Sequence, residues 1–360
     1  MDISQTFEET KDRIKGIIQQ PISIKHLEDL TSAEIGELWD TYMYYSMLTC
    51  VFKYFEKVAR DNHDNDVVPL ISDLLKSFDT RLKWITDTFK RENLRVPTGF
   101  SHNDVNLDAP QLYSNSYILQ YLRNVVRFSL TTHTLNINMA ARPDVRDFYK
   151  EIINAILKFN ERVTNIMLER GILQRHPSIN TSDKVDYTET PGFLAGFIGK
   201  RQSLLAREIA NLYTIAITNH IGRVLLTGFS QVAASDQVRD YMNKGVRIAG
   251  DIINTMTSIL KEDDIPTPLP GDTITMDSNK APFSDKLMML HVLLLNMNGI
   301  GMYAAAMGVS MRHDLHQKYA LAIANTGRFA EEGIKIMIDN GWMEEPPQVV
   351  EHEASAKGIH

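Results

Sequence analysis

Apolar residues recur at helical spacing through most of this chain. A stripe beginning at Ile35 continues to about residue 60, and a second helix is predicted over about 67–92. A third is predicted over about 114–140, and Pro143 opens a fourth that ends near Gly171. No convincing run of alternating apolar and polar residues predicts a sheet. The fold is therefore expected to be all-α.

The same pattern of four predicted helices occurs a second time in the chain. Four further helices are predicted at about 203–233, 236–262, 285–310 and 312–340. An offset of 170 residues relates the segment 166–173 to 336–343, and near the start of each half the offset becomes 174. Pairs at these offsets include Glu34 and Glu208, Ser114 and Ser284, Arg142 and Arg312, Asp144 and Asp314, Tyr149 and Tyr319, Glu161 and Glu331, and Pro177 and Pro347. These matches predict an internal duplication.

One connection in each half is much longer than the others. Residues 94–113 and 264–284 contain prolines and glycine and show no convincing periodicity. A short turn makes neighbouring helices antiparallel, whereas about 20 residues can travel the whole length of a bundle. The second and third helices are then parallel, which predicts two tandem ferritin-like bundles in up-down-down-up order. An up-down-up-down order with two ornamented loops is the alternative.

These patterns divide the chain into five parts. We expect an N-terminal extension (1–29), a first four-helix bundle (30–173), a linker (174–202), a second four-helix bundle (203–347) and a C-terminal tail (348–360). The extension is expected to hold a short amphipathic helix around Phe7 and Ile14. The apolar stretch 192–198 is expected to fill the seam between the bundles, with partner binding as the alternative. The bundles themselves are expected to pack about a pseudo-twofold axis.

Several segments resemble an uncharacterised family of spore-forming bacteria. They are Gly228–Ala233, Pro282–Met289, Ala330–Gly333 and Ile336–Trp342, and the resemblance covers about residues 25–350. The resemblance implies two fused ferritin-like bundles and a distant relationship to a spore coat protein. It supplies no substrate, activity or catalytic residue. A spore-associated location, and self-association or a coat protein as partner, are expectations that rest on it.

Composition and charge narrow the function. A net charge of -7 argues against broad nucleic-acid binding, which needs a basic face. The single cysteine, Cys50, excludes an intramolecular disulfide framework, and no signal peptide is expected, so we expect a cytoplasmic protein. The apolar run 287–311 is long enough to cross a bilayer, but it contains His291 and asparagines, and we expect its own bundle to bury it.

A metal site is the main chemical candidate. A ferritin-like di-iron centre needs Glu-x-x-His on two helices, and this motif is absent from the sequence. A reduced site is predicted in the second unit, where His220, His291 and Glu331 are expected at one level of the bundle; zinc, iron or manganese are the candidate metals. The alternative is that both histidines are core residues bonded to carbonyls or to Asn298, or that they line a small-molecule pocket.

Three functions follow from these observations. The leading hypothesis is a non-enzymatic or cryptic-function protein with a structural, coat-associated or stress-related role. The second is a metal-binding protein or oxidoreductase that uses the second bundle. The third is a scaffold that binds an apolar small molecule in a bundle core.

Overall fold

The computed structural model describes residues 29–181, 183–185, 187–188, 202–269 and 274–348. Within these ranges the chain forms eight α-helices, one short 3₁₀ segment (His102–Asp104) and no β-strand. The first unit contains α2 (Ser32–Asp61), α3 (Val67–Arg91), α4 (Asn115–Met139) and α5 (Pro143–Glu169). The second contains α6 (Ala206–Val232), α7 (Asp236–Glu262), α8 (Asp285–Val309) and α9 (His313–Asp339). Each helix lies within a few residues of its expected bounds. The amphipathic helix expected near Phe7 and the apolar stretch 192–198 lie outside the described residues.

Local sequence signals explain where the helices begin. The side chain of Thr31 accepts a hydrogen bond from the backbone N–H of Glu34 (3.2 Å), and the Glu34 carboxylate accepts one from Thr31 N–H (2.8 Å). This is a reciprocal capping box at the start of α2. The Ser114 side chain caps α4 by accepting from the backbone N–H of Tyr117, and the Ser284 side chain caps α8 by accepting from that of Leu287. Pro143 occupies the first turn of α5.

Contacts between helix ends fix the directions of the first four helices. Glu34 at the start of α2 accepts from Arg142 N–H (2.7 Å) at the start of α5. The Arg142 guanidinium pairs with Glu92 (2.7 Å) at the end of α3. At the opposite end, Arg170 after α5 pairs with Asp64 (2.7 Å) in the turn between α2 and α3. Because α4 ends beside the start of α2, α2 and α5 run in one direction and α3 and α4 in the other.

The second unit repeats this arrangement. Glu208 at the start of α6 accepts from Arg312 N–H (3.2 Å) at the start of α9. The Arg312 guanidinium lies 3.6 Å from the carboxylate of Asp263 at the end of α7. Asn340 after α9 donates to Gln237 (3.2 Å) at the start of α7. The long connections 94–114 and 264–284 therefore each join the end of one helix to the beginning of a helix that runs parallel to it.

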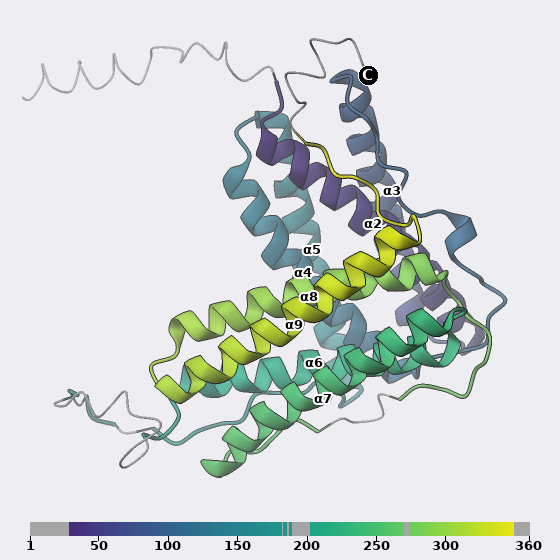
Figure 1. Ribbon diagram of the computed structural model, residues 1–360. Coiled ribbons are helices and arrows are strands. Elements are labelled where there is room, and N and C mark those ends of the chain that lie inside the picture. The colour runs from purple at the N-terminus through teal and green to yellow at the C-terminus, as the bar shows by residue number, and fades with distance from the viewer. Residues whose placement is uncertain (1–28, 182, 186, 189–201, 270–273, 349–360) are drawn as a thin grey trace, which may run out of the picture.

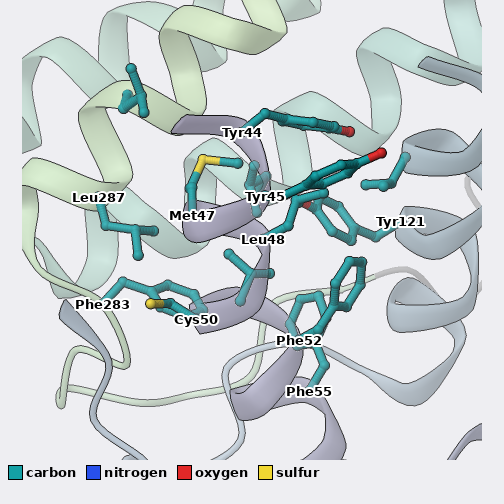
Figure 2. Close-up of a cluster of buried hydrophobic side chains, with 14 of the residues drawn as sticks. Tyr44, Tyr45, Met47, Leu48, Cys50, Phe52, Phe55, Tyr121, Phe283 and Leu287 are labelled. Atoms are coloured by element: carbon teal, nitrogen blue, oxygen red, sulfur yellow. The ribbon is translucent and has the colours of Figure 1, made fainter. Parts of the chain in front are cut away.

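One hydrophobic cluster spans both units, and a second cluster lies within the second unit. Figure 1 shows the units as two groups of helices that cross one another, and the first cluster of buried side chains extends from α2–α5 into α6–α9. In Figure 2, Phe283 and Leu287 of the second unit lie beside Met47 and Cys50 of α2. Burial raises the pKa of the Cys50 thiol to about 11, and its sulfur contacts the carbonyl of Ser101. Cys50 is thus a core residue.

α8 is the one helix among the described residues that is long and apolar enough to cross a bilayer. Core helices of soluble proteins meet the same criterion, so a single such helix is weak support for a span. A third of its most apolar window is buried, and it carries His291 and Asn296 among its buried residues. α8 packs against α9 and α6.

Candidate functional site

The two long connections pair with each other along the seam between the units. One antiparallel bridge joins Val105 to Phe283 and a second joins Tyr113 to Thr275. Val105 and Thr275 are equivalent at the offset of 170 residues, and so are Tyr113 and Phe283, so each bridge is the image of the other. Four backbone hydrogen bonds join the connections within the described residues: Asn106 N to Pro282 O (2.8 Å), Met276 N to Leu112 O (2.8 Å), Ser284 N to Asp104 O (3.1 Å) and Ser114 N to Ile274 O (3.1 Å). This self-complementary pattern is that of an isologous interface, such as the one at a twofold axis of a homodimer.

Tyr121 and His291 meet at the centre of the seam. They occupy the same position in the two units, 170 residues apart, and the Tyr121 hydroxyl lies 2.7 Å from Nε2 of His291. Burial lowers the pKa of His291 to about 3, so the ring is neutral and Nε2 can accept from the hydroxyl. The rings of Tyr121 and Phe229 pack edge-on against the imidazole. This pair is an uncharged contact between the units.

The structure does not bring the three predicted metal ligands together. His291 faces the first unit through Tyr121, whereas His220 lines a separate small pocket with Gln120 and Gln174. Glu331 is exposed on α9. Across the described ranges, no group of three or more His, Cys, Asp and Glu side chains is arranged to hold a metal ion. The site at His220, His291 and Glu331 therefore stays a prediction, which elemental analysis tests.

The rise per residue along a helix predicts the level of a side chain in a bundle, but it does not predict which neighbouring helix that side chain faces. Burial lowers the pKa of His220, and the nearby Arg223 lowers it further. The face of α8 that carries His291 packs against α4 of the other unit, because the shared core extends across the seam. The metal-site prediction was made for a single isolated bundle, so it could not take the contact between α8 and α4 into account.

A buried glutamate closes the same end of each bundle. Oε1 of Glu34 accepts from the backbone N–H groups of Ala141 (2.9 Å) and Arg142 (2.7 Å). Burial raises the pKa of Glu34, but hydrogen bonds from Arg142, Thr31 and Ala141 outweigh it, and the net pKa is lowered. In the second unit, the carboxylate of Glu208 accepts from the backbone N–H groups of Met311 (2.9 Å) and Arg312. Both glutamates are 0% exposed.

A buried arginine lies beside each of these glutamates and pairs with an aspartate two residues later in the chain. Arg142 donates to both carboxylate oxygens of Asp144 (2.7 and 2.9 Å), and Arg312 does the same to Asp314 (3.0 and 2.7 Å). Hydrogen bonds from Arg142 hold the pKa of Asp144 below its ordinary value, although burial opposes them. The polar residues that match between the halves of the sequence thus fasten helix ends.

Glu37 is a buried carboxyl one turn further along α2. Neither of its oxygens has a hydrogen-bond partner among the described residues, and burial, with Glu34 and Asp40 nearby, raises its pKa to about 7. Because the folded pKa lies above the ordinary value of 4.5, the protonated carboxyl is tolerated at low pH, and the free energy of unfolding falls as the pH rises from 4.5 through about 7 and the buried group ionises. We expect Glu37→Gln to raise the free energy of unfolding by about 2 kcal/mol at alkaline pH and to change it little in acid. Urea unfolding on both sides of that pKa measures the difference, and an equal effect at the two pH values would contradict the assignment.

The first bundle contains a cavity of about 190 Å³ between α3, α4 and α5, which is open to the surface on one side. Apolar side chains form most of its wall: Leu74, Phe78, Val125, Val126, Ile156 and Phe159. Arg81 and Tyr45 also line it, and Nη1 of Arg81 donates to the Tyr45 hydroxyl (3.2 Å). That hydroxyl lies 2.6 Å from Nε2 of His133, whose pKa burial lowers to about 3, with the charge of Arg81 acting in the same direction.

A smaller cavity of about 60 Å³ occupies the equivalent place in the second bundle. Asn93 and Asp264 are the left-handed residues that follow α3 and α7, and they align these helices at an offset of 171. Arg81 then corresponds to Ile252, which lines the second cavity. Tyr45 corresponds to Asn219, which accepts from the Tyr303 hydroxyl (2.9 Å). The two interiors have therefore diverged: the first contains a cation and the second is neutral.

Comparisons with known proteins were made for the whole chain. No curated protein matches it. A solved structure from Bacillus halodurans C-125, described as a "putative spore coat protein", is similar at 15% sequence identity with a TM-score of 0.39. That match covers 42% of this chain and 98% of the other. The family model described as "Protein of unknown function (DUF3231)" matches twice in tandem, over residues 21–185 and 192–354. These two matches cover nearly the whole chain, which belongs to the DUF3231 family and carries two tandem copies of its domain.

Proposed function

We propose that this chain is a non-enzymatic structural protein made of two fused ferritin-like bundles, with a coat-associated or stress-related role. The observation that carries the proposal is the seam, where equivalent backbone segments of the two units pair with each other. An isologous contact of this kind belongs to a homodimer. Here one polypeptide takes the place of two subunits, so the association does not depend on protein concentration.

The helix directions support the ferritin-like part of the proposal. In each unit the first and fourth helices run together and the middle two run in the opposite direction, which is the order of bundles with one long crossover. The buried polar residues shared by the units support the structural part. Hydrogen bonds join helix ends through Glu34 and Arg142 in the first unit and through Glu208 and Arg312 in the second. In the seam, Tyr121 is hydrogen-bonded to its counterpart His291.

The coat-associated role is tested by fractionating cells and spores of the native host. Quantitative immunoblotting compares the chain in coat extracts, in spore interiors and in vegetative cells with and without heat stress. Enrichment in coat extracts supports a coat-associated role, and induction by heat in vegetative cells supports a stress-related one. Both roles would be overturned if the chain were not enriched in coat extracts and its amount in vegetative cells did not change with heat stress.

Elemental analysis of the purified full chain tests the alternative, a metal-binding protein or oxidoreductase. We expect far less than about one iron, zinc or manganese ion per chain after expression in supplemented medium. A stoichiometric metal that is lost in His220→Ala and kept in the matched control His313→Ala, an exposed histidine at the start of α9, would overturn the structural proposal in favour of the second-bundle site.

A further inference from the structure

We propose that the cavity of the first bundle binds a small apolar monocarboxylate, with the carboxylate on Arg81 and the apolar part against the bundle core. This binding site goes beyond the structural function proposed above and does not depend on it. Its residues come from α2, α3, α4 and α5, all within the first unit.

Arg81 is a buried cation that has no acidic partner among the residues the structure describes. Its side chain is in the core of the bundle, with 7% of the residue exposed. Within the described part of the chain, Arg81 contacts Tyr45 in two ways: Nη1 donates a hydrogen bond to the hydroxyl (3.2 Å), and the guanidinium carbon lies 5.2 Å from the ring centroid. A guanidinium has five N–H donors, and a buried charge is costly unless it is paired. A bound carboxylate would supply both the missing charge and two acceptors in the geometry that guanidinium prefers.

The neighbours of Arg81 do not compete for this role. Because Tyr45 accepts from Arg81, its own proton is available to Nε2 of His133, which lies 2.6 Å away. His133 is neutral, since burial lowers its pKa to about 3. The Arg81–Tyr45–His133 chain therefore fixes the guanidinium beside the cavity and leaves its positive charge uncompensated.

The rest of the cavity fits an apolar body. Its volume of about 190 Å³ exceeds the roughly 150 Å³ of an apolar protein cavity that is known to bind benzene. Its wall is made mainly of aromatic and branched aliphatic side chains, Phe78, Ile156 and Phe159 among them. A ligand the size of benzoate or a short branched fatty acid fits such a space, whereas a long alkyl chain does not.

The charges at the mouth favour the approach of an anion. Asp73, Lys158 and Arg162 are exposed residues of α3 and α5 that line the cavity. Arg162 is paired with Asp73 (2.9 Å), and Lys158 forms no ion pair among the described residues. With Arg81 inside and Lys158 outside, the entrance carries a net positive charge, which steers anions inward. The equivalent cavity of the second bundle has Ile252 in place of Arg81 and serves as an internal negative control.

Isothermal titration calorimetry on the full chain tests the proposal with three probes. Benzoate supplies the charge and the ring, benzamide is its neutral counterpart, and acetate has the charge without the ring. We expect saturable binding of benzoate at one site, with benzamide and acetate each weaker by about tenfold or more, because a hydrogen-bonded charge and a buried ring contribute separately. Equal binding of benzoate and benzamide, or no binding of benzoate, would overturn the proposal.

Variants locate the site. Arg81→Met is expected to weaken benzoate binding by about 10- to 100-fold while leaving a folded protein, since a buried cation without a partner is replaced by an apolar side chain of similar length. Arg162→Met at the mouth is the matched control and should change affinity by less than about threefold, as expected for an exposed ion pair. Ala155→Phe should block binding by filling the cavity with Arg81 intact. Benzoate binding that survives both Arg81→Met and Ala155→Phe would place it elsewhere and sink the inference.

Discussion

Replacing Glu34 with alanine is expected to lower the free energy of unfolding by about 3–5 kcal/mol. The side chain is 0% exposed, and its two oxygens accept from the N–H groups of Thr31, Ala141 and Arg142. Alanine leaves these donors buried without acceptors at the point where α2, α4 and α5 meet. It also removes an anion near the start of two helices, where negative charge is stabilising.

The duplication provides an internal repeat of this experiment. Glu208→Ala should cost a similar amount, because Glu208 accepts from Leu205, Met311 and Arg312 in the same geometry. Glu161→Ala, a substitution of an exposed glutamate on α5, is the matched control and should change stability by less than about 0.5 kcal/mol. Urea unfolding of the three variants gives the comparison. A loss below about 1 kcal/mol for both buried glutamates would show that the closures are not structural.

The pH dependence of Glu34 has a definite sign. Its folded pKa is below the ordinary 4.5, because the hydrogen bonds it accepts outweigh the opposing effect of burial. The stabilising effect is therefore present above 4.5 and is lost as the pH falls through the folded pKa. The stability difference between the native chain and Glu34→Gln should shrink in acid. Glu37, on the same helix, behaves in the opposite way, so the two glutamates titrate with opposite effects on stability.

The helices could be predicted from sequence because their signals are local. The apolar stripe, the capping box at Thr31 and the proline at position 143 each act within a turn or two of the chain. The duplication added a second, independent copy of the same pattern, and the family match over two tandem segments agrees with it. The all-α class and the bounds of each helix followed from those signals.

The interior chemistry could not be predicted in the same way. Arg81 lies three residues after Phe78 and four before Ile85, on the buried stripe of α3, and a cation at such a position is the one signal that could have indicated the cavity. The contact of Tyr121 with His291 depends on how two units face each other, which no periodicity within one unit contains.

Gly228→Ala is expected to be among the most damaging single-methyl changes in the chain. A Cβ built on Gly228 in α6 would lie 2.5–2.6 Å from ring atoms and the hydroxyl of Tyr113, across the seam. Tyr113 is 1% exposed, stacks on Tyr117 with ring centroids 4.6 Å apart and donates to the carbonyl of Leu225 (2.9 Å), so its ring has no room to withdraw. We expect a loss of about 2–4 kcal/mol from this overpacking.

Gly222→Ala on the same helix is the matched control for Gly228→Ala. A Cβ at Gly222 meets nothing within 4 Å, so alanine there should raise stability by up to about 1 kcal/mol through helix propensity. The same chemical change on one helix is thus expected to have opposite signs, and only the seam distinguishes the two positions. Hydrogen exchange gives the specific readout: in Gly228→Ala the N–H groups of Asn106 and Met276, which join the two connections, should exchange faster. Unchanged exchange in 104–114 and 274–284, together with a loss of stability, would mean that the strain is confined to α6 and that the seam tolerates it.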